Sequence, residues 1–447
     1  NWDVRVVIPN YSCIPEYFRN QMQYVTHFYM STGPYIQNKY VGVLQYEFEG
    51  ITYYFIDNQE YFSGDKPYGD FRTDIEKFTF FDKAVLSMLP LIGFRPDLIH
   101  CHDWQTGLIP VYLRTLYSTQ SYYSGMKTVF SIHNLKFQGR WMLSEVKDIT
   151  GLPENVFTSD KLEAYGEANY LKGGLVFADA ITTVSKTYAK EIMTAEGGEG
   201  LQGLLSARSN DVYGIVNGLD YDVFNPEKDV AIAKNFKVTN AKTGKKANKL
   251  ALQKEFALPT DEGTYLMGIV GRLTDQKGLD LVAHIMEELL QTAKIQIIVL
   301  GTGEGRYEEM FRYFENKYPN QIKAYIGYSE ELAHRIYASC DSFLMPSLFE
   351  PCGLSQLMSM RYGTLPIVRE TGGLKDTVEA YNEYEQTGTG FSFKNYNAHE
   401  MLDTIRYSLK VYYDQRKQWD AMVKRAMKQD FSWNRSAREY EELYDRY

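Results

Sequence analysis

The stretch SLFEPCGLSQ, residues 347–356, decides how this chain folds. It follows an apolar run, residues 342–346, that is typical of a buried strand, and it leads into residues 354–362, whose apolar side chains recur at helical spacing until Gly363. The sequence therefore predicts a strand-to-helix turn that holds Glu350 beside the first amides of a helix. Because those amides have no partner inside the helix, the turn is either an anion site with an acid beside it or a loop whose Glu caps the helix.

Length and composition limit the possible functions. The chain has 447 residues, enough for two or three domains, and its 44% hydrophobic and 23% charged residues are typical of globular proteins. A net charge of −9 argues against binding to nucleic acid or to a membrane surface, because both favour basic proteins. No apolar run approaches the roughly 18 residues that a membrane helix needs, and we see no signal-peptide pattern. The 4 cysteines lack metal-site spacing, which favours reduced thiols in a cytoplasmic protein.

Short apolar strands alternate with helical segments in two series. The first series follows a predicted hairpin of residues 40–48 and 51–56, and its strands are residues 98–102, 128–133, 180–184 and 213–216. The second series consists of residues 265–270, 295–300, 322–326, 342–345 and 365–368. Such alternation predicts an α/β protein with parallel sheets. We therefore expect two doubly wound, Rossmann-like domains that face each other across a cleft, where the carboxyl ends of strands bind ligands.

The predicted domain boundaries follow changes in composition. We expect an N-terminal domain over residues 1–220, an interdomain connection over 221–258, a second domain over 259–429 and, over 430–447, a helix that packs back on the first domain. The connection includes a lysine-rich run, residues 234–249, which we expect to be a solvated helix face.

Two basic residues follow the first strand of the second series, in the turn GRLTDQKG. Arg272 and Lys277 suit a diphosphate, although a surface turn with ion pairs has the same composition. Tyr328 follows another strand, where it either stacks on a base or is an ordinary rim or core tyrosine. The segment GTGEG at 301–305 lacks the spacing of a dinucleotide fingerprint, which disfavours a nicotinamide-dependent oxidoreductase.

Polar residues also end two strands of the first series. Asp103 follows His100 and His102, which share one face of their strand, and His133 and Asn134 end the next strand. This cluster supplies too few converging ligands for a metal site. Asp103 and His133 are therefore either groups that bind substrate hydroxyls or ordinary turn residues.

Taken together, these motifs resemble bacterial and plant-type glycogen (starch) synthases, which are retaining GT-B glycosyltransferases of family 5. The resemblance runs from Asp3 almost to the C-terminus. It rests on 102–104 (HDW), 128–139 with HN at 133–134, 214–218 (GIVNG), 271–273 with 276–278 (GRL and QKG), 346–356, 361–366 (RYGTLP) and 371–374 (TGGL).

The resemblance implies transfer of glucose from ADP-glucose to the non-reducing 4-OH of an α-1,4-glucan, with retention of configuration and without a metal or cofactor. The catalytic residues that it implies are Glu350, His133, Asp103, Arg272 and Lys277. The donor-binding residues that it implies are Asn134, Asn217, Tyr328, Cys352, Gly353, Leu354 and Ser355.

The chain departs from the family pattern in two places. Family members begin with a further strand, a Lys-x-Gly-Gly loop and a helix, which are absent before Asn1. The resemblance therefore leaves open a fragment, an incomplete gene product or a form with a compromised active site. Many retaining GT-B enzymes also carry a second Glu where this chain has Met358. The alternatives are a truncated form that only binds nucleotide or glucan, and another retaining GT-B glucosyltransferase such as a sucrose-type synthase. The sequence predicts no oligomeric state.

Overall fold

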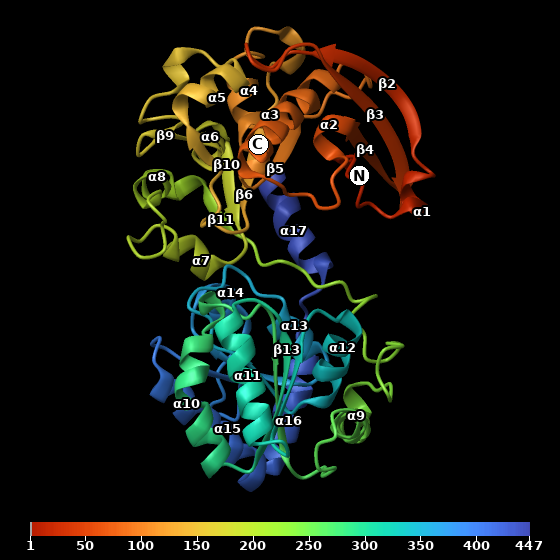
Figure 1. Ribbon diagram of the computed structural model, residues 1–447, viewed down its shortest axis with the longest axis vertical. Helices are drawn as coiled ribbons and strands as arrows, with labels where there is room; N and C mark the ends of the chain where they lie inside the picture. Colours follow the sequence, from red (N-terminus) through yellow and green to blue (C-terminus); the bar gives the residue numbers. More distant parts are fainter. Residues whose placement is uncertain (1) are drawn as a thin grey trace. The chain divides into compact units, whose positions relative to one another are not determined.

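The computed structural model describes residues 2–447 and divides into two compact units. The first unit contains the chain up to Thr183 together with Ile192–Tyr213 and Tyr444–Tyr447. The second contains Val184–Glu191 and Gly214–Leu443. Figure 1 shows both units as α/β structures, so the predicted fold class is confirmed for each.

The second unit is built on one sheet of six parallel strands in the order β14-β13-β12-β15-β16-β17. The strands are β12 (Tyr265–Val270), β13 (Ile295–Gly301), β14 (Ile322–Ile326), β15 (Ser342–Met345), β16 (Leu365–Arg369) and β17 (Phe391–Phe393). The central strands are buried because helices cover both faces, as their continuous apolar sequences predicted. The short edge strand β17 was not predicted.

The following helices belong to the second unit, except that Tyr444 at the end of the last one lies in the first unit. They are α7 (Lys186–Glu191), α9 (Ala241–Glu255), α10 (Leu279–Thr292), α11 (Gly305–Lys317), α12 (Glu330–Ser339), α13 (Ser355–Arg361), α14 (Gly372–Thr377), α15 (Ala398–Asp414), α16 (Arg416–Met427) and α17 (Trp433–Tyr444). In Figure 1, α10 and α11 lie on one side of β13, and α12 and α9 lie on the other. The predicted helix at 354–362 is α13, and Gly363 follows it with φ +72°.

The strand order places a topological switch point in the middle of this sheet. From β12 the chain passes outward through β13 to β14, whereas from β15 it passes outward through β16 to β17. The loops that follow β12 and β15 therefore leave in opposite directions at the carboxyl ends of these neighbouring strands. Sheets of this type bind ligands at that point.

The first unit differs from the single doubly wound sheet that the sequence suggested. Its main strands form two separate sheets, β1-β4-β3-β2 and β11-β10-β6-β5, and a small third sheet has the order β7-β9-β8. The strands are β1 (Arg5–Pro9), β2 (Gln23–Met30), β3 (Lys39–Phe48), β4 (Ile51–Asp57), β5 (Leu98–His102), β6 (Lys127–Ile132), β7 (Arg140–Met142), β8 (Glu163–Ala164), β9 (Glu167–Asn169), β10 (Ala180–Thr183) and β11 (Val212–Gly214).

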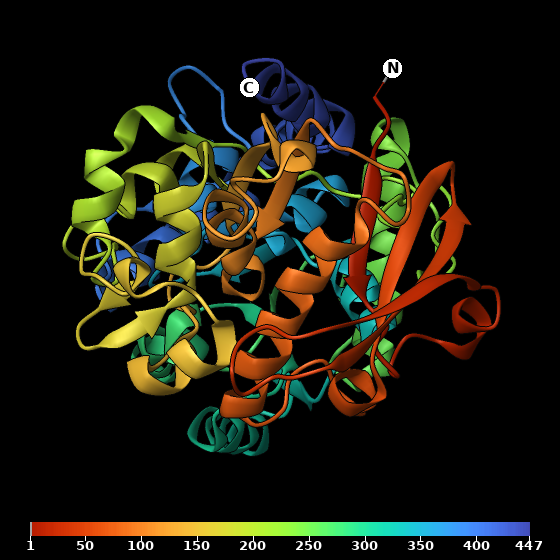
Figure 2. The same ribbon diagram turned by 90° about the horizontal axis from the view of Figure 1, so that it is seen from above.

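The predicted hairpin is confirmed as β3 and β4. Phe48 pairs with Ile51, and Glu49 and Gly50 between them have φ of 52° and 80°, which suits a two-residue turn. Figure 2 shows these antiparallel strands, in red, as a twisted layer.

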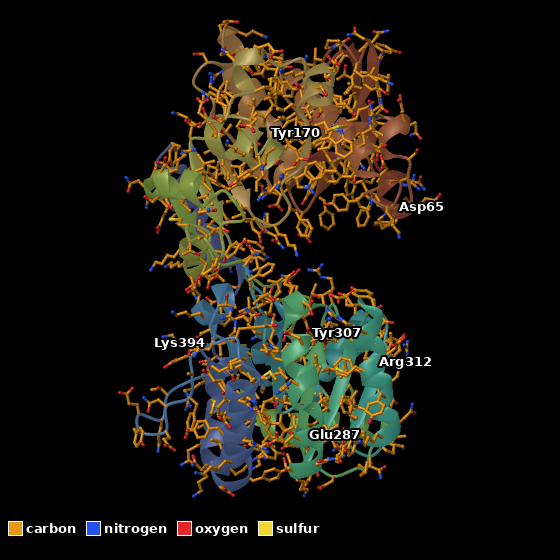
Figure 3. All side chains as sticks on the ribbon, turned by 60° about the vertical axis from the view of Figure 1, so that its left-hand side comes forward. Asp65, Tyr170, Glu287, Tyr307, Arg312 and Lys394 are labelled. Carbon is orange, nitrogen blue, oxygen red and sulfur yellow. The ribbon has the colours of Figure 1, made fainter. Side chains whose placement is uncertain are left out.

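The first unit contains further helices, several of which pack around a buried aromatic core. They are α1 (Glu16–Arg19), α2 (Gln59–Phe62), α3 (Phe71–Met88), α4 (Leu108–Arg114), α5 (Leu143–Thr150), α6 (Tyr170–Phe177) and α8 (Gln202–Ala207). Tyr170, labelled in Figure 3, is fully buried and shares a hydrogen bond of 2.5 Å with Thr79 of α3.

The domain boundaries need three corrections. Residues 221–258 belong to the second unit, because α9 packs against α12 instead of forming a free connection. Residues 184–191 also belong to it, since the amide of Thr187 donates to Asp376 at 2.8 Å. Of the terminal segment, only Tyr444–Tyr447 lies in the first unit, whereas Ser436 hydrogen-bonds to the carbonyl of Val216 in the second at 2.6 Å.

The lysine-rich run is not a purely solvated face. The ammonium of Lys245 donates to the carbonyls of Tyr337, Ala338 and Tyr362 and to the hydroxyl of Thr364, at 2.7–3.4 Å. Lys249 is 3% exposed and pairs with Asp341 at 2.6 Å. Lys249 is buried and Lys245 is half-buried, and oxygen acceptors from neighbouring elements compensate their lost hydration.

Among residues 2–447, no helix is long and apolar enough to cross a membrane. All four cysteines are free of disulfide bonds, as we expected from their spacing.

Candidate active site

The turn after β15 holds a buried carboxylate. Glu350 is 6% exposed, and its Oε2 accepts hydrogen bonds from Lys277 Nζ at 2.7 Å and from the Ser347 hydroxyl at 2.9 Å. Its side chain does not cap α13, whose N-cap residue is Leu354. The capping interpretation of this turn is therefore wrong, and the carboxylate belongs to an ion pair at the switch point of the sheet.

Lys277 reaches Glu350 because two loops pack together. Lys277 ends a 3-10 turn (Asp275–Lys277), and Gly278 follows with φ +74°. A Cβ atom at Gly278 would lie far inside contact distance of the Pro346 carbonyl, so only glycine allows this approach. The amide of Leu348 donates to the carbonyl of Gln276 at 2.9 Å and joins the loops directly.

The same 3-10 turn is held from α11. The hydroxyl of Tyr307, labelled in Figure 3, donates to Asp275, and the guanidinium of Arg306 binds the same carboxylate at 2.6 Å. These contacts lower the pKa of Asp275, first through the hydrogen bond from Tyr307 and then through that from Arg306. The turn that holds Lys277 beside Glu350 is thus fixed at its first residue, Asp275.

The two glycines that begin α14 allow a second close approach. Gly372 has φ +45°, and a Cβ atom there would collide with the carbonyl of Glu350. A Cβ atom at Gly373 would collide with the carbonyl of Cys352. The amide of Gly373 donates to the Glu350 carbonyl at 3.0 Å, so the glycine pair supports the turn itself.

Two supporting residues were missed by sequence reasoning. Arg369, at the end of β16, donates to the carbonyls of Ser347, at 2.9 Å, and Leu348. Glu191 of α7 accepts from the amide of Gly372 at 3.0 Å. Arg369 could have been predicted, because it is a basic residue at a strand end. Nothing in the sequence links Glu191 to Gly372, which lies 181 positions later.

The start of α13 presents backbone amides. Within residues 2–447, the amides of Leu354 and Ser355 have no hydrogen-bond acceptor. Gly353 has φ +72° and lies against Gln356, whose side-chain amide donates to the Cys352 and Gly353 carbonyls at 3.0 and 2.9 Å. The turn therefore leaves two donors at the positive end of a helix.

Cys352 is a buried structural thiol. It is 4% exposed, and burial raises its pKa to about 12, while the backbone amide of Asn217 hydrogen-bonds to it. The structure thus brings the predicted residues Cys352 and Asn217 together. A thiol with this pKa remains protonated and is a poor nucleophile.

Arg272 and Tyr328 are exposed at strand ends of the same sheet. Arg272 follows β12, and its guanidinium has no partner in the part of the chain that the structure describes. Tyr328 follows β14 and is 84% exposed, which excludes a core position. Both side chains are therefore accessible to a ligand.

In the GTGEG segment at the end of β13, close packing accounts for two of the glycines. Cβ atoms at Gly301 and Gly303 would collide with the carbonyls of Gly271 and Leu273. Its glycines thus admit the neighbouring loop, and they do not form a dinucleotide fingerprint.

In the first unit, three histidines form a stacked row. The ring centroids of His100 and His102 are 4.3 Å apart, and His102 Nδ1 lies 3.0 Å from His133 Nε2. Burial lowers the pKa of His100 strongly and that of His102 to about 4. The Nδ1 and Nε2 atoms of His100 form hydrogen bonds with the hydroxyls of Tyr444, at 2.6 Å, and Ser131, at 2.7 Å. His100 and His102 are therefore neutral members of this hydrogen-bonded row.

Asp103 organises the loop after β6. It has φ +57°, a conformation that non-glycine residues rarely adopt, and its Oδ1 accepts from the amide of His133 at 2.8 Å. Burial raises its pKa, against the opposing effects of the His133 charge and of the His133 and Asn134 amides. The structure thus brings Asp103, His133 and Asn134 together at the ends of the paired strands β5 and β6.

Comparison with known proteins decides the family. The starch synthase catalytic domain matches residues 1–207, and the glycosyl transferases group 1 domain matches residues 252–426. The chain is 61% identical over 444 residues to a glycogen synthase from Lachnospira eligens, covering 99% of this chain and 92% of that protein. This chain belongs to the glycogen synthase family. It is therefore a glycosyltransferase, as the sequence predicted.

Solved structures support the same assignment. The catalytic domain of starch synthase IV from Arabidopsis thaliana, bound to ADP and acarbose, is 32% identical with a TM-score of 0.88, covering 99% of this chain and 92% of that one. A sucrose-phosphate synthase from Thermosynechococcus elongatus has a TM-score of 0.57 at 16% identity, covering 93% and 87% of the two chains, and so shares the fold alone. The GT-B fold is thereby confirmed.

Proposed function

We propose that this chain transfers glucose from ADP-glucose to the non-reducing 4-OH of an α-1,4-glucan, with retention of configuration. One observation carries the proposal: a lysine and a buried glutamate, 2.7 Å apart, occupy the switch point of a six-stranded parallel sheet. A cation beside a carboxylate suits a substrate that breaks into an anionic nucleotide and a cationic sugar. The ADP and acarbose bound by the Arabidopsis starch synthase IV domain support this choice of donor and glucan.

The second unit supplies the proposed nucleotide site. Arg272 and Lys277 bind the diphosphate, with the free amides of Leu354 and Ser355 as further donors. Tyr328 stacks on the base, for which its 84% exposure leaves it available. Asn217, Cys352 and Gly353 shape the turn beside the glucose.

Glu350 and three residues of the first unit are proposed to act on the sugar. As the C1–O bond to the phosphate breaks, positive charge develops on the glucosyl ring, and the Glu350 carboxylate stabilises it. The departing phosphate oxygen takes the proton of the acceptor 4-OH as the new C1–O4 bond forms on the same face. Asp103, His133 and Asn134 bind glucose hydroxyls, a role carried over from the family.

This reaction requires no metal or cofactor in our proposal, because Arg272, Lys277 and the amides neutralise the leaving group. We also propose that the protein works in the cytoplasm and that neither nucleic acid nor membrane is a partner.

The test is transfer to maltoheptaose from ADP-glucose and from UDP-glucose, followed by proton NMR of the new anomeric centre. We expect α-linked products and faster transfer from ADP-glucose. A β-linked product, or faster transfer from UDP-glucose, would overturn the stereochemistry or the donor. If ADP binds but no glucose is transferred, the chain is a nucleotide-binding form of the fold and the catalytic part of the proposal fails.

A further inference from the structure

A cavity of about 630 Å³ lies in the second unit among residues of α9, α15 and α16. Its lining also includes Glu262 and Gly263, which precede β12, and Asp341, which precedes β15. The cavity is therefore at the amino ends of the strands, whereas Glu350 and Lys277 follow their carboxyl ends. In Figure 1 these three helices reach the lower end of the second unit, and α14 lies at its upper end. No residue of the proposed nucleotide site lines it.

The cavity concentrates positive charge. Its lining has six basic side chains, from Lys242, Lys245, Lys246, Lys249, Arg416 and Lys424. It has three acidic side chains, from Glu262, Asp341 and Asp420. The lining therefore has more basic than acidic groups, whereas the whole chain has a net charge of −9. A local charge opposite in sign to that of the protein indicates a site for an anion.

The lysines of α9 share one face. Lys242, Lys245, Lys246 and Lys249 follow the spacing i, i+3, i+4, i+7, so all four project toward the cavity side of the helix. Two of them lie in the first five residues of α9, which has no acidic residue in its first turn. Lysines at a helix N-terminus are unfavourable because that end is positive, and a bound anion would offset this.

These cations divide into an anchored and an accessible group. Lys245 and Lys249 are held by the oxygen acceptors described above, and burial lowers the pKa of Lys245 to about 7. Lys242, Lys246, Arg416 and Lys424 are exposed. Asp420 is bound by both Lys242, at 3.1 Å, and Arg416, at 3.2 Å, and Lys246 pairs with Glu262. Lys424 forms no ion pair within residues 2–447. The accessible group therefore has four cations against two carboxylates, Asp420 and Glu262, so its positive charge is not fully neutralised.

We propose that this cavity binds a small organic phosphate, a phosphomonoester or diphosphate on a sugar-sized group, independently of the nucleotide site. Its volume lies within the roughly 300–1,000 Å³ of small-molecule sites. Lysines bind phosphate as compact charges, and the planar guanidinium of Arg416 can donate two parallel hydrogen bonds to phosphate oxygens. Tyr412 and Tyr413, which also line the cavity, provide ring surface and hydroxyls for the organic part.

The test is calorimetric titration at low salt in a Lys277→Ala background, which weakens anion binding at the nucleotide site. Inorganic pyrophosphate and glucose 6-phosphate are the two probes. We expect saturable binding of at least one, weakened more than tenfold when Lys242→Ala and Lys424→Ala are added. Both side chains are exposed, so melting temperature checks that folding is unchanged.

Lys417→Ala is the matched control, because Lys417 is an exposed residue of α16 that does not line the cavity. Tighter binding of glucose 6-phosphate would identify a phosphomonoester site, and tighter binding of pyrophosphate a diphosphate site. Equal affinity with and without Lys242 and Lys424, equal losses from the control, or no saturable binding would each overturn the proposal. Because no step requires glucose transfer, this result is independent of the proposed enzyme activity.

Discussion

At the scale of single residues, the contact between Lys277 and Glu350 has two consequences. The lysine is held close to the carboxylate, and the carboxylate is oriented by hydrogen bonds from Lys277 and Ser347. A diphosphate that binds Lys277 must share it with Glu350. The two side chains should therefore affect different steps when they are changed.

We predict that Lys277→Ala weakens ADP binding by about 10-fold to 150-fold, which corresponds to one charge-assisted hydrogen bond of about 1.5–3 kcal/mol. Glu350→Gln should slow transfer by more than tenfold and change ADP affinity less, because its charge acts on the sugar. Calorimetry and single-turnover transfer separate the two effects.

Lys317→Ala is the matched control, since Lys317 pairs with Glu287 at 2.7 Å in an exposed ion pair (Figure 3 labels Glu287). Such pairs contribute about 0–1 kcal/mol, so neither binding nor transfer should change. Normal transfer in both site variants would refute our assignment of the site.

Acid should destabilise the first unit through its histidine row. Burial lowers the pKa of His100 and of His102, the latter to about 4, from an ordinary value near 6.5. Between these pH values the unfolded chain binds protons that the folded chain does not. The stabilisation is therefore present above about pH 6.5 and is lost as the pH falls toward 4.

This predicts a melting temperature that falls between pH 7 and pH 5, and falls less steeply in His102→Gln. His399→Gln is the control, because His399 is an exposed residue of α15 in the second unit. The same pH dependence in His102→Gln as in the unchanged chain would contradict the role of the row.

At the scale of elements, Gly372 allows the start of α14 to pack against the turn that holds Glu350. Gly372→Ala places a methyl group against the Glu350 carbonyl at φ +45°, so α14 or the turn must move. We expect unfolding to become easier by about 1–3 kcal/mol and transfer to fall.

Gly305→Ala in α11 has open space around its Cβ position and should be neutral or slightly stabilising. Thermal melting and transfer assays compare the two variants. Equal stability and activity would show that the turn does not depend on this approach.

Much of the second unit could be predicted at this scale. Tyr265–Val270 and Ser342–Met345 were predicted with the observed bounds, because continuous apolar runs between turn residues report a strand buried on both faces. The partly exposed edge strand Ile322–Ile326 was also predicted with its observed bounds. The strand ends in turn placed Arg272, Lys277 and Glu350 at one edge of the sheet. These local patterns carry enough information to locate the candidate site.

The rest depends on long-range contacts that no local pattern encodes. Lys245 and Lys249 look like solvated lysines until acceptors from distant elements surround them. Glu191 supports a turn from α7, far along the chain. The division of the first unit into two sheets likewise depends on which strand edges meet, and apolar runs alone do not determine this.

At the scale of the whole molecule, the residues proposed to bind the nucleotide and those proposed to bind the glucose belong to different units. The proposed nucleotide contacts, Arg272, Lys277, Tyr328 and the α13 amides, all lie in the second unit. Asp103, His133 and Asn134 lie in the first. We therefore expect substitutions at Arg272 or Lys277 to lower nucleotide affinity, and substitutions at Asp103 or His133 to lower transfer.

The most direct test of this account is calorimetric titration of the chain with ADP and with UDP, repeated on Lys277→Ala. We predict saturable binding that is tighter for ADP and is weakened at least tenfold by the substitution. Absence of saturable binding for either nucleotide, or equal affinity of the unchanged chain and Lys277→Ala, would contradict a nucleotide site at the switch point of the second unit.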